Sequence, residues 1–135
     1  MKRTLWRWRA ARDEAGQALV ELALVLPLML LIMVGVIEFA RAWNLQQVLT
    51  DAVREGGRRA ALADAQPWDS TAKAMWDRID QAGYNPTYSS LPGAAPPNFK
   101  VHDARVTITV TMPYRFWVLP FRSITMKSSF TVRNE

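Results

Sequence analysis

Residues 18–37 read ALVELALVLPLMLLIMVGVI, and this stretch decides the fold. Glu21 is the one charged residue in it. An α-helix rises about 1.5 Å per residue, so this stretch would extend roughly 30 Å. That length matches the hydrocarbon core of a bilayer. The stretch therefore predicts a transmembrane helix near the N-terminus.

Basic residues are concentrated on the N-terminal side of this predicted span. Residues 1–16 contain five Lys and Arg, whereas residues 38–57 contain only Arg41 and Arg54. Cytoplasmic flanks of membrane helices are enriched in Lys and Arg. We therefore expect the N-terminus in the cytoplasm and the C-terminal part on the outer side of the membrane.

The composition also bears on function. Of the net charge of +5, residues 1–16 carry +3, which favours a contact with anionic lipid over nucleic-acid binding. The chain has no cysteine, which excludes disulfides and thiol catalysis. His102, beside Asp103, is the only histidine, and no nucleophile–base pair, metal-ligand cluster or phosphate-binding loop accompanies it. We expect no enzyme activity, no metal, no cofactor and no small-molecule substrate.

The helical pattern continues past the membrane to about Ala63. The apolar residues that recur at three- and four-residue steps are Phe39, Ala42, Trp43, Leu49, Ala52, Val53 and Ala60. Gly56-Gly57 weakens a helix by about 1 kcal/mol per glycine relative to alanine. Either the helix hinges there, or close packing requires positions without a side chain. Pro27 is predicted to kink the span, although a tolerated transmembrane proline explains it equally well.

A short second helix is expected after Gln66-Pro67. Asp69 or Ser70 would cap it, and Gly83 would end it after about Ala82. Its apolar face would comprise Ala72, Met75, Trp76 and Ile79. The following residues, 84–98, are rich in Pro, Gly and Ser and indicate an irregular loop.

Two segments near the C-terminus alternate apolar and polar residues. The apolar positions are Ala104, Val106, Ile108, Val110 and Met112 in the first segment and Ile124, Met126, Phe130 and Val132 in the second. Such alternation predicts two antiparallel strands with one buried face. The fold class is thus α+β, a long helix followed by a small domain with a short helix and a β-hairpin or small sheet. The expected divisions are a leader at 1–16, the long helix at 17–63 (membrane 18–37, amphipathic 38–63) and the small domain at 64–135.

Gly16 and Glu21 lie at the N-terminal edge of the predicted span, with four residues between them. After a basic leader, this arrangement resembles the processing site of type IV pilin-like proteins, where prepilin peptidase cleaves after the glycine. Gln17 would then become the first residue. Independently, a carboxylate inside a membrane helix is costly and needs a partner, which the new α-amino group of Gln17 would supply. The alternative is that Glu21 lies among lipid head groups and only helps to start the helix.

A longer run supports a family resemblance. The matching elements are Gly16, Val20-Glu21, residues 24–28 (LVLPL), residues 37–39 (IEF), Gln46-Gln47 and residues 52–56 (AVREG). Residues 16–62 thus resemble the TadE/TadG-like family of the tight-adherence (Flp, type IVc) pilus system, and the small outer domain favours the TadE-like type. Leu22 departs from the family pattern, which often has an aromatic residue after the glutamate.

The resemblance implies a minor pilin, or pseudopilin, that takes part in assembling a Tad pilus for adhesion or secretion. Its implied location is the bacterial inner membrane, with a periplasmic or extracellular C-terminal domain and incorporation into a pilus. The implied partners are the prepilin peptidase, other pilin subunits and the Tad assembly platform.

Two further features could form surfaces for partners. Glu38, at the outer edge of the span, either pairs with a partner helix or is a solvated helix flank. Residues 114–121, YRFWVLPF, are unusually apolar for a connection between strands. They either fold back into the core or form an exposed patch that docks another pilin subunit or the outer leaflet. The docking interpretation assigns the contacts to Phe116, Trp117 and Phe121.

Two other classes of protein fit the same sequence. A generic signal-anchored protein with a small periplasmic binding domain would keep its leader and tolerate a change of Glu21. A secreted domain would be cleaved near Ala40-Arg41-Ala42, although its apolar run would exceed the usual 7 to 15 residues.

Overall fold

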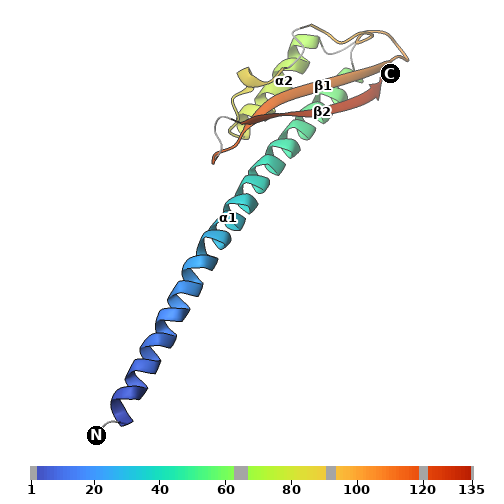
Figure 1. Ribbon diagram of the computed structural model, residues 1–135. Coiled ribbons are helices and arrows are strands. Elements are labelled where there is room, and N and C mark those ends of the chain that lie inside the picture. The colour runs from blue at the N-terminus through green and yellow to red at the C-terminus, as the bar shows by residue number, and fades with distance from the viewer. Residues whose placement is uncertain (1–2, 63–66, 91–93, 119–121, 135) are drawn as a thin grey trace. The chain divides into compact units, whose positions relative to one another are not determined.

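The computed structural model describes residues 3–62, 67–90, 94–118 and 122–134, with the backbone alone at residues 3–15 and at Tyr88. The fold is α+β, as the sequence predicts. Its elements are the helices α1 (Arg3–Ala60) and α2 (Trp68–Gln81), a 3-10 helix η1 (Pro86–Tyr88), and the strands β1 (Arg105–Arg115) and β2 (Ser123–Arg133) (Figure 1). The chain divides into two compact units, Met1–Phe39 and Ala40–Glu135.

The first unit consists of the N-terminal part of α1. This helix begins at Arg3, well before the expected start at Gln17, because no proline or glycine interrupts residues 3–15. It continues as an α-helix through Pro27. Within the described residues, one helical segment, Gly16–Ala60, is long and apolar enough to cross a membrane. The structure thus agrees with the predicted membrane anchor.

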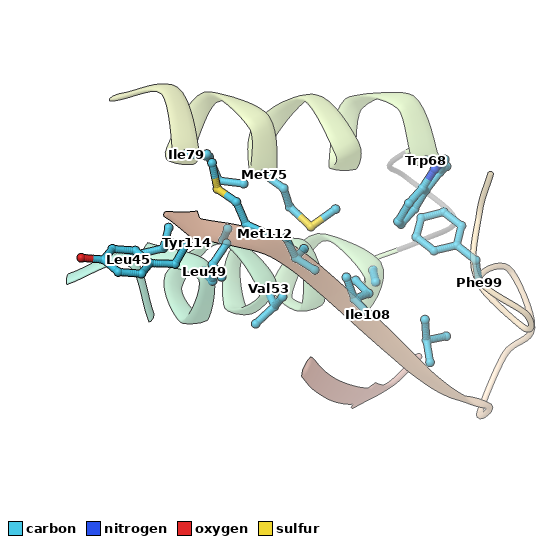
Figure 2. Close-up of a cluster of buried hydrophobic side chains, with 14 residues drawn as sticks. Leu45, Leu49, Val53, Trp68, Met75, Ile79, Phe99, Ile108, Met112 and Tyr114 are labelled. Carbon is cyan, nitrogen blue, oxygen red and sulfur yellow. The ribbon is translucent and has the colours of Figure 1, made fainter. Parts of the chain in front are cut away.

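The second unit contains a core enclosed by the C-terminal part of α1, by α2 and by the hairpin of β1 and β2 (Figure 2). Leu45 and Tyr114 lie at one end of this core, and Trp68 and Phe99 lie at the other. The Trp68 and Phe99 rings meet edge to face with centroids 5.2 Å apart. Sequentially distant segments therefore close both ends of one core.

The buried face of α1 contains most of the predicted residues, namely Leu49, Ala52, Val53 and Ala60. It also contains Leu45, which the pattern missed, whereas Phe39 and Trp43 are 68% and 57% exposed. Apolar residues occupy both sides of the helix around Phe39 and Trp43, so their spacing alone did not show which of them meet the core. The helix ends at Ala60, while the predicted end at about Ala63 lies outside the described residues.

The Gly56-Gly57 pair is explained by close packing within this continuous helix. A Cβ atom on Gly56 would meet Sδ of Met75 and would lie 3.1 Å from its Cγ. A Cβ atom on Gly57 would lie 2.6 Å from Cε1 of Phe130. Because Gly56 and Gly57 have no side chains, α2 packs closely against one side of α1 and β2 against another. The helix is continuous through both glycines, so the alternative of a hinge is not observed.

The strands pair antiparallel over their whole length, with Ile108 opposite Phe130 and Val110 opposite Ser128. The even-numbered residues Val106, Ile108, Val110 and Met112 face the core, as predicted. On the edge of β1 that faces away from β2, the Thr111 carbonyl accepts a hydrogen bond from the Ser90 N–H at 2.7 Å. Because backbone groups alternate in direction along a strand, Pro113 faces that same outer edge, and its missing N–H costs no bond to β2.

Helix α2 begins one or two residues before the predicted caps. Pro67 is the N-cap residue and provides no side-chain bond, while the Ser70 hydroxyl donates to the Pro67 carbonyl at 2.8 Å. The earlier start places Trp68 in the core and leaves Trp76, a predicted core residue, 47% exposed. Gly83 ends the helix as predicted, with a φ of 81° that favours glycine.

Candidate functional site

The predicted processing residues lie in the first unit on a fully helical backbone. Gly16, Gln17 and Glu21 are all exposed. A Cβ atom on Gly16 would meet no atom within 4 Å, so packing inside the described chain gives no reason for glycine at this position. Gln17 and Glu21 are four residues apart in α1, which places them one helical turn apart on the same side.

The remainder of the predicted span presents large apolar side chains on all sides. From Leu22 to Ile37, the large apolar residues other than Val34 are 42% to 74% exposed. Monomeric soluble proteins rarely expose apolar patches of more than a few hundred Å². This segment therefore requires a surrounding apolar phase, either lipid or the helices of other subunits.

Glu38, a candidate for a partner contact, is only 9% exposed and is therefore buried. The expectation of a solvated helix flank is therefore wrong. The contact of Glu38 with a partner helix stays a prediction.

Residues 114–121 divide between the two interpretations. Tyr114 is 4% exposed and packs edge to face with Phe116, which is partly buried against the core. Trp117 and Val118 are 71% and 54% exposed. Phe121, the third predicted contact, lies outside the described residues. The start of the segment is thus core, and an exposed apolar surface begins at Trp117.

A charged network lies on α1 next to the glycine pair. Glu55 accepts hydrogen bonds from Arg58 at 3.0 and 3.1 Å and from Arg59 at 2.8 Å. The hydrogen bond from Arg58, and then that from Arg59, lower the pKa of Glu55 from 4.5 to about 2. Glu55 and Arg59 are four residues apart in α1, and Asp51 and Arg54, which pair at 3.8 Å, are three apart, so each pair lies along one side of the helix. Both are structural features of an exposed helix face.

Sequence reasoning missed a cavity of about 270 Å³ in the second unit. Arg41, from α1, and Arg115, from the end of β1, line it together with Tyr84 and with the buried side chains of Leu45 and Tyr114. The Asn44 amide donates to the Tyr84 hydroxyl at 3.1 Å and connects α1 to the segment after α2. The one signal in the sequence for this cavity was the apolar character of residues 114–121, two of which, Tyr114 and Arg115, line it.

The described residues contain no group of three or more His, Asp and Glu side chains arranged to hold a metal ion. His102 is exposed and lies with Asp103 in the turn before β1. The Asp103 carboxylate instead pairs with Arg133 at 2.5 Å.

Comparison with known proteins gives one family match. Residues 16–58 match a family described as TadE-like protein. The matched segment begins at Gly16 and ends two residues before the end of α1. No curated protein matches the chain. No solved structure matches it either.

Proposed function

The chain is TadE-like over residues 16–58, and from this premise we propose that it is a minor pilin of a Tad pilus. In this role prepilin peptidase removes residues 1–16, and Gln17 becomes the first residue. The processed helix then packs in the membrane or in the filament, and the second unit contacts other subunits. The role is structural, not catalytic.

The observation that carries the proposal is where the family match begins. It starts at Gly16, a residue for which no contact within 4 Å of a Cβ atom requires glycine. Gly35 also lacks such contacts, so recognition of Gly16 by a peptidase is supported by its position, between the basic leader and the apolar segment and at the start of the family match. The adjacent exposed apolar segment supports burial in a bilayer or among subunit helices.

The proposed role of Glu21 is to set the position of the helix among its neighbours. After cleavage, the positively charged α-amino group of Gln17 would lie one turn away or on an adjacent subunit. In an apolar environment an unpaired carboxylate is costly, so subunits would assemble in the register that pairs these two groups. A variant without the charge would lose that preference.

Pilus assembly in a strain lacking the native gene tests this role. We expect Glu21→Gln to insert in the membrane at normal levels but to reduce the assembled pili severalfold. The matched control is Glu14→Gln, the same change on the other side of the cleavage site, which should leave assembly unchanged because that residue is removed. Normal assembly with Glu21→Gln would contradict the role and favour a generic signal-anchored protein.

A further inference from the structure

The cavity beside Arg41 lies at the end of the second unit where the chain enters it from the apolar segment. The described residues that line it belong to this unit, and two of them, Arg41 and Arg115, are arginines. Arg41 and Arg115 are both exposed, whereas Leu45, Met112 and Tyr114 are at most 5% exposed. The cavity thus has a cationic rim and an apolar floor.

The hairpin brings further groups to this end. Gln46 donates to the Lys127 carbonyl at 3.3 Å, and Gly57, more than two helical turns further on, lies against Phe130. The strands therefore run along α1 with their closed end toward Arg41. Trp117 and Val118, which follow Arg115 closely in the chain, have exposed side chains at this end.

We propose that this cavity binds the phosphate of an anionic phospholipid head group, with the side chains of Trp117 and Val118 inserted among the neighbouring lipids. Guanidinium groups match phosphate oxygens through paired hydrogen bonds. Trp side chains favour the membrane–water interface because their rings are apolar and their N–H groups are polar. The combination of two arginines and exposed apolar side chains fits a lipid better than a soluble phosphate compound.

Chain continuity supports a lipid as the occupant. Arg41 follows Ile37, the last residue of the predicted span, by about one helical turn, so its side chain is within reach of the head groups. The inference depends on the membrane anchor alone. It does not depend on cleavage after Gly16 or on pilus assembly, so an unprocessed Gly16→Ala chain should bind lipid equally well.

Native mass spectrometry of the full chain in detergent, with equal amounts of phosphatidylglycerol and phosphatidylcholine, tests the site. We expect wild type to retain phosphatidylglycerol over phosphatidylcholine by about tenfold. The Arg41→Gln/Arg115→Gln variant should reduce this ratio to about one. The matched control, Arg105→Gln/Lys127→Gln, removes the same charge from exposed hairpin positions outside the cavity and should keep the preference.

Two outcomes of that experiment would overturn the site. One is an undiminished preference in the double arginine variant; the other is an equal loss in the control, which would indicate non-specific charge attraction. Glycerol 1-phosphate in millimolar excess should fail to displace the lipid because it has no acyl chains. Displacement would identify a site for soluble phosphates instead.

Spin labels test the apolar rim separately, because the chain has no native cysteine. In phosphatidylglycerol-containing nanodiscs, a nitroxide on Val118→Cys should be more accessible to oxygen than to a nickel chelate. A nitroxide on Ser129→Cys, an exposed position within β2, should show the reverse. If the label at position 118 behaves like the label at position 129, the lipid contact is wrong.

Discussion

Gly57 lies directly against the ring of Phe130, so that a Cβ atom at Gly57 would be 2.6 Å from Cε1 and 3.4 Å from Cγ of that ring. This contact joins α1 to β2. Together with the approach of Met75 to Gly56, it allows one helix to support both α2 and the hairpin. The glycine pair therefore allows α2 and β2 to pack closely against α1 in the second unit.

Gly57→Ala should destabilise the second unit by a net amount of about 1 kcal/mol. Displacing the Phe130 ring costs about 1–3 kcal/mol. The higher helix propensity of alanine offsets about 1 kcal/mol of this cost. Removing the ring should abolish this destabilisation, so that Gly57→Ala leaves the free energy of unfolding unchanged or raises it in a Phe130→Ala background. Denaturant unfolding of the full chain in detergent measures both values. A stabilising effect in the wild-type background would contradict the packing account.

Glu55→Gln should lower the free energy of unfolding by up to about 1 kcal/mol at neutral pH, because it removes charge-assisted bonds from Arg58 and Arg59 on a partly exposed surface. Since the pKa of Glu55 is lowered to about 2 in the fold, the stabilisation is full above about 4.5. It is lost as the pH falls through about 2, and wild type and variant should become equal only below that pH.

Asp51→Asn is the matched control for this experiment. Its pair with Arg54 is longer, at 3.8 Å, and both side chains are more than 60% exposed. We therefore expect almost no change in stability. The assignment to Glu55 would be wrong if Asp51→Asn cost as much, or if the Glu55→Gln difference persisted unchanged at pH 2.

Local patterns predicted the elements well because they act over short distances. The alternation in residues 104–112 identified the buried face of β1, and the single glycine at position 83 identified the end of α2. Trp76 was expected on the apolar face of α2 and is 47% exposed instead. Helical spacing groups apolar residues on one side but does not say whether protein, lipid or water covers that side.

Features that join distant segments were not predictable from periodicity. Arg41 and Arg115 share one cavity only because the hairpin runs along α1 in one particular direction. Asn134 is another example: 3% exposed, it donates at 2.8 Å to the Phe99 carbonyl and fixes the segment before β1. Nothing in the local sequence around either site indicates these contacts, because they depend on the strand register and on the tertiary packing.

The identity of the mature N-terminus tests the central claim most directly. The chain is purified from the membranes of cells with an active prepilin peptidase, and its N-terminal peptide is sequenced by mass spectrometry. We predict a start at Gln17 in wild type and in Gly35→Ala, a control glycine that likewise has no atom within 4 Å of a Cβ position. Gly16→Ala should retain residues 1–16. A wild-type protein that still begins at Met1 would contradict processing as a pilin.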